Sequence, residues 1–471
     1  MNDQTKTTTF VSEKTGNTEK YKTIKTGVRN DDQVVNPETT NFVQLREEMR
    51  KKMEEKIENK LEENLAEALS NPKSKAVRYG VIGSGHGGSR IAEQFYQFGY
   101  PVCVINTSQQ DLHHINLPKE NKLFMDYSLG GAGKDMDIGS AAVEENEENI
   151  KQMLELVFDK DLTKIDSIVL CISGGGGSGG GSAIPLIQII SDYKIPMTVI
   201  YTLPMSSEGT ITKSNAVVCL DRLAQLSVNK LINGLVVIDN SRIEELYSDV
   251  SLGGFFKVAN FDIANIFNTF NTLSSLPTQY AAIDPMDFTR IMTSGNCTIY
   301  GKVEIPLTIE NGRVSMDEDN VAELLIHGLQ DGLLAEGFNI TDAIRAGVYI
   351  TGKSEYLTQI PASTFSYAFA SLNEELKKAD LFKGIYSDER LQDKLVIYTL
   401  ISGVGLPRER VEMLKEQAQQ DLSEMEEKEQ AMKSKMEVFQ QTIKKEDDKY
   451  KLQKKNNSTF GKMVNRRRSR N

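Results

Sequence analysis

The chain of 471 residues has no tryptophan, only four cysteines and four histidines, and no apolar run of membrane-spanning length. The cysteines, at positions 103, 171, 219 and 297, form no close pairs, so neither a disulfide framework nor a cysteine–histidine zinc site is indicated. Charges or glycines interrupt every apolar stretch before about 18 residues, which excludes a membrane span. No signal peptide is recognisable. We therefore expect a cytoplasmic protein with reduced cysteines and no membrane partner.

Most of the chain also lacks a net positive charge. There are 66 acidic and 55 basic residues, so the formal net charge is −11. This charge excludes a protein that coats nucleic acid with its whole surface. Basic residues are concentrated, without any acid, only over 451–471. With 39% hydrophobic residues the chain can nevertheless bury a sizeable core.

Changes in composition divide the chain into consecutive segments. They are a flexible tail (1–40), an amphipathic helix (41–75), a nucleotide-binding domain (76–253), a long central helix (254–276), a second domain (277–406), an exposed helix (407–450) and a basic disordered tail (451–471). In the nucleotide-binding domain, strand patterns alternate with helix-length segments, which predicts an α/β fold with a Rossmann-like parallel sheet. The second, smaller domain mixes strands over 298–305, 346–351 and 395–400 with helices over 320–334 and 364–378, which predicts an α+β structure.

A first glycine-rich loop, Gly83-Ser84-Gly85-His86-Gly87-Gly88, lies between an expected strand and an expected helix. Glycines allow a close backbone approach to a ligand, and a helix N-terminus favours a phosphate. Gly83, Gly85 and Gly88 also satisfy the G-x-G-x-x-G dinucleotide fingerprint. The acidic residue that grips the ribose in such proteins is missing, because the second strand ends in Asn106-Thr107-Ser108. An NAD-dependent Rossmann oxidoreductase therefore stays open as an alternative.

A second glycine run covers residues 173–182, between an apolar strand and a helix expected to start near Ala183. Such a composition is typical of a flexible linker, but the apolar flanks favour a loop wrapped on a ligand. No Lys-Ser or Lys-Thr pair closes it, so it is not a Walker P-loop. Two further loops, over 130–135 and 204–209, follow strands or lie where the carboxyl ends of strands are expected. Four loops at one sheet edge predict a nucleotide polyphosphate held mainly by backbone N–H groups.

The run Gly175-Gly176-Gly177-Ser178-Gly179-Gly180-Gly181 resembles the G-G-G-[ST]-G-x-G signature of the tubulin/FtsZ superfamily of filament-forming GTPases, and the resemblance covers residues 76–300. It implies GTP or GDP as ligand, with Mg²⁺, and head-to-tail polymerisation of the chain with itself. It also implies further roles: Asn106 and Thr107 belong to what the family has as its second nucleotide loop, Gly131, Ala132 and Gly133 lie at the γ-phosphate, and Pro204 and Glu208 lie at the ribose. Asn240, Phe256 and Asn260 lie at the base. Amide side chains offer the donor and acceptor that a guanine edge requires.

The segment Ile283-Asp284-Pro285-Met286-Asp287-Phe288 is similar to the loop of this family whose acids enter the nucleotide pocket of the next subunit. By this resemblance, Asp284 and Asp287 are the catalytic residues. Their spacing alone favours acids at a helix N-terminus, where the dipole stabilises them, and it is the glycine signature upstream that favours the catalytic interpretation. A filament protein that has lost hydrolysis is therefore a further alternative.

Within the superfamily, the chain looks most like the TubZ proteins that segregate plasmids and phage genomes. The helix before the GTPase core, the Asp-Pro-x-Asp loop, the long helix after Leu406 and the basic end carry this likeness. It implies an adaptor protein on DNA as partner of residues 451–471. Direct contact of this segment with DNA phosphates is a second possibility, and a merely solvated tail is a third.

Overall fold

The structure, a computed structural model, describes residues 75–127, 130–246, 252–278, 280–310, 313–316, 321–326, 337–377 and 379–468. They belong to one compact unit, Ile57–Asn471. The tail expected over 1–40 and nearly all of the helix expected over 41–75 lie outside the described residues. In the described part of the chain, no helix is both long and apolar enough to cross a bilayer.

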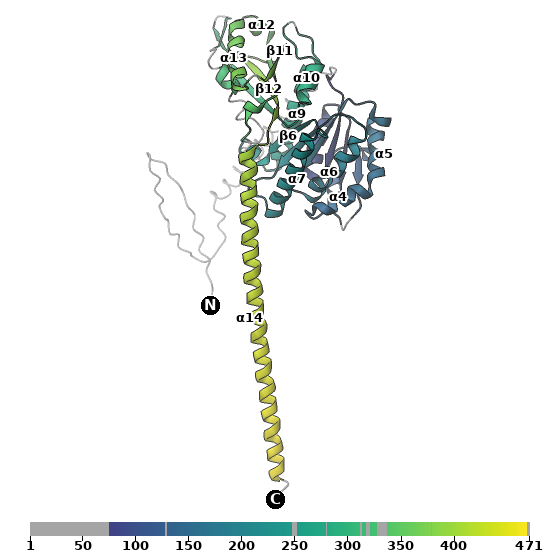
Figure 1. Cartoon of the computed structure of the whole chain (residues 1–471), viewed down its shortest axis with the longest axis vertical. Helices are drawn as coiled ribbons and strands as arrows, with labels where there is room; N and C mark the ends of the chain where they lie inside the picture. Colours follow the sequence, from purple (N-terminus) through teal and green to yellow (C-terminus); the bar gives the residue numbers. More distant parts are fainter. Residues whose placement is uncertain are drawn as a thin grey trace, which may run out of the picture. The chain divides into compact units, whose positions relative to one another are not determined.

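A ten-stranded sheet forms the centre of the fold, in the order β11-β10-β12-β7-β6-β5-β4-β1-β2-β3 (Figure 1). The strands from β6 to β3 are all parallel, whereas β12 runs antiparallel to β7 and β10. The α/β fold with a parallel sheet is thus confirmed. The strand bounds are β1 Tyr79–Ser84, β2 Val102–Asn106, β3 Lys122–Phe124, β4 Ser167–Ser173, β5 Met197–Leu203, β6 Gly234–Asp239, β7 Cys297–Pro306, β10 Arg345–Gly352, β11 Asp380–Ser387 and β12 Lys394–Val404. A separate hairpin pairs β8 (Thr308–Glu310) with β9 (Arg313–Ser315).

Helices connect the parallel strands, as the βαβ pattern requires. Their bounds are α2 Gly85–Gln97, α3 Gln109–His113, α4 Met136–Glu145, α5 Glu147–Phe158, α6 Gly177–Ser191, α7 Thr210–Val228, α8 Asn240–Leu246, α9 Leu252–Leu273, α10 Pro285–Met292, α12 Ser354–Leu357, α13 Ala362–Glu375 and α14 Arg408–Arg468. The strands β1, β5 and β6 are buried along their whole length. Burial on both faces explains why they are continuous apolar runs rather than alternating ones.

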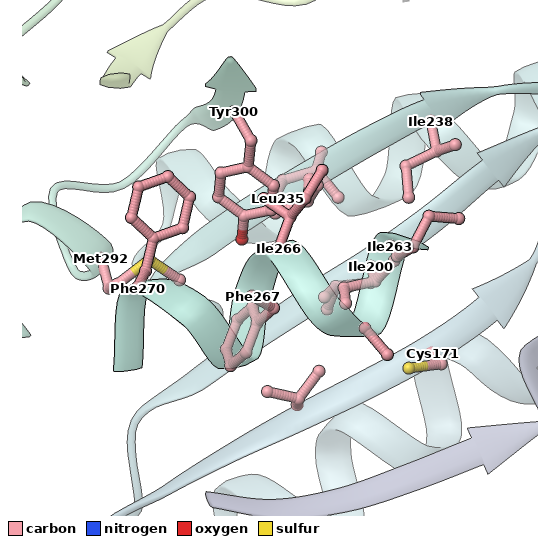
Figure 2. Packing of buried hydrophobic residues seen from close by; sticks show 14 of the residues in the cluster. Cys171, Ile200, Leu235, Ile238, Ile263, Ile266, Phe267, Phe270, Met292 and Tyr300 are labelled. Atoms are coloured by element: carbon pink, nitrogen blue, oxygen red, sulfur yellow. The ribbon is translucent and has the colours of Figure 1, made fainter. Parts of the chain in front are cut away.

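The helix α9 joins the two halves of the sheet through its aromatic side chains. Phe267 packs edge-on against Tyr79 of β1, with ring centroids 5.0 Å apart. One turn later, Phe270 packs against Tyr349 of β10 at 5.1 Å. Figure 2 shows Phe267 and Phe270 on α9, with Tyr300 beside them. The sheet itself holds the halves together less firmly, since β6 and β7 pair only at Leu235 and Cys297.

Two expected elements differ from the observed ones by several residues or more, and a third is described only in part. The helix expected from Ala183 begins six residues earlier, at Gly177. The helix expected over 407–450 continues to Arg468, so the basic segment expected to be disordered is helical for most of its length. No proline interrupts residues 408–468, and extending an existing helix avoids the cost of nucleation. Of the helix expected over 320–334, only residues 321–326 are described, and these are helical.

Candidate functional site

A cavity of about 1030 Å³ opens at the carboxyl ends of the parallel strands. Ser173 at the end of β4, Thr202 near the end of β5 and Asn240 directly after β6 line it. The N-terminal part of α9 supplies Phe256 and Asn260 from the other side. In open α/β sheets this edge is the usual ligand site. The volume is at the upper end of what small-molecule pockets offer, which is about 300–1,000 Å³.

Many of the residues expected to bind nucleotide line this cavity. They are His86, Gly87, Gly175, Gly176, Pro204, Glu208, Asn240, Phe256 and Asn260. The other expected residues stand outside the lining: Gly83, Ser84, Gly85, Gly88, Asn106, Thr107, Gly131, Ala132, Gly133, Gly177, Ser178, Gly179, Gly180 and Gly181. Three basic side chains that the sequence reasoning missed, Arg90, Lys134 and Lys257, also line the cavity. Lys134 belongs to the loop over 130–135, so its position could have been inferred.

The loop residues that do not line the cavity are packed against the second glycine run. The Thr107 hydroxyl lies 2.5 Å from the Ser178 hydroxyl. Gly85 has a positive φ of 69°, and a Cβ placed on it would lie 2.7 Å from the backbone nitrogen of Gly179. A Cβ on Gly177 would lie 2.8 Å from the Cβ of Ala132. The structure therefore brings the first three loops together around the start of α6.

Close backbone packing explains why the run contains so many glycines. A Cβ on Gly181 would lie 2.1 Å from the carbonyl oxygen of Met136 in α4, and one on Gly139 would lie 2.1 Å from the carbonyl oxygen of Gly177. These glycines let α4 and α6 approach closely. Gly175 and Gly176, in contrast, precede α6 and face the cavity. The run is thus a short loop followed by a tightly packed helix start, and not one continuous loop.

The dinucleotide-like spacing of the first loop has a similar explanation. A Cβ on Gly88 would lie 2.2 Å from the carbonyl oxygen of Cys171 in β4, and one on Gly83 would lie 2.8 Å from the carbonyl oxygen of Gly88. Gly83 and Gly88 are therefore required for α2 to pack on the sheet. The spacing does not by itself indicate a dinucleotide.

Arg410, in the first turn of α14, supports two walls of the cavity from behind. Its Nε and Nη2 donate to the carboxylate of Asp239 at 2.6 and 3.1 Å, and these side chains are only 3% and 4% exposed. Nη2 also donates to the carbonyl oxygen of Pro204 and to the Ser241 hydroxyl, each at 3.0 Å. The sequence reasoning missed this residue. A weak signal was available, since the helix dipole disfavours a cation in a first turn unless other groups hold it.

Burial makes the ionisable groups beneath the cavity harder to deprotonate. Tyr201 of β5 donates its hydroxyl to the carbonyl oxygen of Ala216 at 2.6 Å, and burial raises its pKa well above the usual 10.0. Burial likewise raises the pKa of the Cys171 thiol in β4. Charge at the site therefore comes from the lining residues Arg90, Lys134 and Lys257 and from the acids Glu93 and Glu208.

The structure offers no protein cage for a metal ion. Among the described residues, no group of three or more His, Cys, Asp or Glu side chains is arranged to hold one. The Glu208 carboxylate accepts the N–H of Met205 at 3.0 Å. The residues present therefore do not fit a resident Mg²⁺ site built by the protein alone.

The two expected catalytic aspartates lie away from the cavity. Asp284 caps α10, because its Oδ1 accepts the N–H of Asp287 at 2.8 Å. The Oδ1 of Asp287 lies 3.6 Å from Nη1 of Arg290. Residues near the N-terminal end of α9 line the cavity, whereas α10 follows the C-terminal end of α9. From Phe261, which lines the cavity, to its end at Leu273, α9 rises about 18 Å, so the aspartates beyond that end do not reach the cavity of their own chain.

The chain has the architecture of a nucleotide-binding α/β protein. Its parallel sheet carries a cavity at the carboxyl edge, and glycine-rich loops surround the start of α6. The model of the Tubulin/FtsZ family GTPase domain matches residues 78–248. The model of the TubZ-like C-terminal domain of Tubulin/FtsZ-like proteins matches residues 268–415. The chain belongs to the tubulin/FtsZ family, whose members are filament-forming GTPases. This membership overturns the alternative of an NAD-dependent oxidoreductase.

The sequence identity to individual relatives is low. The chain is 25% identical over 332 residues to the tubulin-like protein CetZ of Pyrococcus horikoshii, covering 69% of this chain and 85% of CetZ. It is 22% identical over 385 residues to the tubulin-like protein TubZ of Bacillus thuringiensis subsp. israelensis, covering 72% of this chain and 76% of TubZ. The crystal structure of a GTPγS-form protofilament of TubZ from serovar israelensis superimposes with a TM-score of 0.66 at 20% identity, covering 76% of this chain and 95% of that one. At this identity the superposition shows the shared fold.

Proposed function

We propose that the cavity binds GTP and that the hydrolytic site is completed by a second copy of the chain. The position of Asp284 and Asp287, at the end of α9 opposite the cavity, carries this proposal. Gly175 and Gly176 present backbone N–H groups to the phosphates. Arg90, Lys134 and Lys257 add positive charge for a polyphosphate. Asn240 and Asn260 offer the amide groups that a guanine edge requires.

Asp284 and Asp287 of the adjoining copy orient the attacking water against the γ-phosphate. Each contact then joins two different surfaces, the cavity of one copy and the α10 end of the next. Such a heterologous contact does not close, so it produces a filament. Hydrolysis removes the γ-phosphate from the interface and weakens it, which makes the filament dynamic. Mg²⁺ would bind mainly through the phosphates, since the described residues offer no ligand cluster, and we assign it no step.

We further propose that these filaments move plasmid or phage DNA through an adaptor protein. The match to the TubZ-like C-terminal domain supports this role. The helical segment 451–468 is rich in lysine and arginine and contains no acid, so it suits an acidic adaptor surface or, secondarily, DNA phosphates. The likeness to CetZ is also compatible with a cytoskeletal role that does not involve DNA. Binding of a DNA-bound adaptor to residues 451–471 would favour DNA movement over that role.

The shared site is tested by phosphate release from GTP at increasing protein concentration. The rate per molecule rises steeply above a critical concentration if copies complete each other. We expect Asp287→Asn and Asp284→Asn to bind GTP but to turn it over at least about 100-fold more slowly than the wild type. Asparagine at position 284 retains the cap of α10. Glu310→Gln, an exposed acid of β8, is the matched control. A normal rate for Asp287→Asn removes that residue from the mechanism.

Complementation tests the sharing directly. Gly176→Phe fills the cavity but retains both aspartates, whereas Asp287→Asn retains the cavity. Mixing the two inactive variants should restore part of the turnover, because some contacts then join an intact cavity to intact aspartates. If the mixture stays inactive while each variant still assembles, the two halves do not form one site. A wild-type chain that binds GTP without any turnover would instead identify a filament protein that has lost hydrolysis.

A further inference from the structure

A buried hydroxyl group in the wall of the cavity has no partner in the protein. Thr212, in the first turn of α7, lines the cavity and is only 5% exposed. Among the described residues, its Oγ1 atom has no hydrogen-bond partner. It does not donate to a carbonyl oxygen of the preceding turn, which is a common partner of a threonine inside a helix. Because a buried hydroxyl without a partner costs stability, this group requires an explanation.

Its position in the cavity distinguishes Thr212 from similar groups elsewhere. In the described part of the chain, buried hydroxyls without a partner also occur at Ser89, Ser227, Thr298, Tyr300 and Thr399. None of these residues lines the cavity. Thr212 therefore lies where a bound ligand can supply the missing partner.

The N-terminus of α7 adds unpaired donors at the same place. α7 begins after Gly209, which has no side chain to cap the helix, and the first turn contains no acid. The first hydrogen bond of the helix runs from the N–H of Lys213 to the carbonyl oxygen of Gly209, so the N–H groups of residues 210–212 have no partner within the helix. Asp135 and Asp284, in contrast, cap α4 and α10. Free N–H groups and the positive end of the helix dipole favour an anion.

The contacts of Thr212 place this helix start between two loops of the cavity. Glu208, one helical turn before Thr212, belongs to the loop that follows β5. On the other side, a Cβ on Gly175 would lie 2.2 Å from Cγ2 of Thr212, so the threonine methyl group packs directly on the glycine run that follows β4.

The order of the strands at this edge sets the order of the nucleotide groups. Asn240, which we assign to the base, follows β6, and β6, β5 and β4 are neighbours in the sheet. A GTP with its base at Asn240 and its outer phosphates at Gly175 and Gly176 passes the start of α7 between the ribose and the glycine run. The group at this point of the nucleotide is the α-phosphate.

We propose that the Thr212 hydroxyl and the N-terminus of α7 bind the α-phosphate of the nucleotide. This inference rests on the proposed GTP site and adds a second helix start to that of α6. The hydroxyl donates its hydrogen to a phosphate oxygen, so binding supplies the partner that the protein alone lacks. Because GTP and GDP both carry an α-phosphate, this contact retains the nucleotide equally before and after hydrolysis.

The test compares Thr212→Val with Thr298→Val. The control removes an equally buried hydroxyl without a partner from β7, away from the cavity. Valine is close to threonine in shape, and neither substitution leaves another protein group unpaired, so both variants should melt at or above the temperature of the nucleotide-free wild type. A lower melting temperature for Thr212→Val alone would mean that the hydroxyl has a partner in the protein, which overturns the proposal.

Isothermal titration calorimetry then measures nucleotide affinity. Thr212→Val should bind GTP and GDP each about 10-fold more weakly, as expected for the loss of a hydrogen bond to a charged group. Thr298→Val should bind both like the wild type, and Thr212→Ser, which keeps the hydroxyl, should retain most of the affinity. Unchanged binding by Thr212→Val overturns this inference and leaves the GTP site intact. A wild type that binds neither nucleotide overturns the proposed function and this inference together.

Dideoxy-GDP, which lacks both ribose hydroxyls, separates the α-phosphate from the ribose. If Thr212 binds the phosphate, Thr212→Val weakens the binding of GDP and of dideoxy-GDP by the same factor. A loss that affects GDP but not dideoxy-GDP would assign the hydroxyl to the ribose. A loss confined to GTP would assign it to the terminal phosphate. Either result overturns the proposal.

Discussion

Arg410 links the C-terminal helix to the nucleotide cavity through a single side chain. Its guanidinium holds Asp239, Ser241 and the carbonyl oxygen of Pro204, which lie directly beside Asn240 and within the loop that carries Glu208. A planar fork with several donors matches this set, and a lysine does not. The two cavity walls formed by Asn240 and by the loop with Pro204 and Glu208 therefore depend on the position of α14.

Arg410→Met should destabilise the protein by about 3–5 kcal/mol, because it leaves Asp239 buried without its partner. Adding Asp239→Asn should recover part of this loss, since the unpaired charge is then removed. The free energy of unfolding in urea measures both effects. The affinity for a fluorescent GTP analogue should fall in Arg410→Met and also in Arg410→Lys. Lys415→Met is the control: its partner Asp221 is 4.0 Å away and both are half-exposed, so little should change. An unaltered affinity in the Arg410 variants would show that the cavity walls do not need this contact.

Among the elements, α4 and α6 form the tightest contact near the site. Their approach depends on glycines whose Cβ positions are already occupied by backbone atoms. The same packing sets where α6 begins and so where Gly175 and Gly176 meet the cavity. The glycine signature thus serves helix packing in its second half, whereas its first half lines the cavity.

Gly181→Ala should destabilise the fold by about 1–3 kcal/mol or more, because the added methyl group overlaps the carbonyl of Met136 and forces α4 and α6 apart. GTP affinity should fall with it, since the start of α6 shifts. Gly405→Ala is the matched control, because no atom lies within 3.9 Å of its Cβ position and its φ is not positive. Thermal unfolding compares the two. Equal melting temperatures would mean that the helices tolerate the methyl group.

For the molecule as a whole, burial of ionisable groups predicts a loss of stability at high pH. Burial raises the pKa of Cys219 and Cys297 to about 12, above the usual 9.0, and it raises those of Tyr79 and Tyr201 above 10.0. The unfolded chain therefore loses these protons first. The stabilisation is complete below pH 9 and declines as the pH rises through the folded pKa values. Lys75, whose pKa burial lowers to about 8, acts in the opposite direction between pH 8 and 10.5.

Urea unfolding between pH 8 and 11 should show a falling midpoint above about pH 9, with a steeper fall once the tyrosines contribute. The thiols should react with a disulfide reagent only as fast as the protein unfolds, since all four are buried. Rapid modification of the native protein would contradict the burial. A midpoint that rises throughout this range would mean that Lys75 outweighs the other groups.

The local pattern predicted most of the sheet. The expected strand over 102–106 coincides with β2, and that over 197–203 with β5, because apolar runs between turn residues have few other interpretations. The short strand β3 and β11, which is only partly buried, were not anticipated. The start of α6 was misplaced, because glycine has a low helix propensity and tertiary contact overrides it there. The domain boundaries and the roles of the site residues stay predictions.

The sequence by itself determined that the chain has a parallel α/β sheet with glycine-rich loops at one edge, and it pointed to the tubulin/FtsZ family, because residue spacing encodes local geometry and backbone approach. Only the tertiary structure decided which loops reach the cavity and that Arg410 supports its walls. It also decided that α9 separates the cavity from Asp284 and Asp287. These relations depend on distances between residues far apart in the chain, which no local pattern specifies.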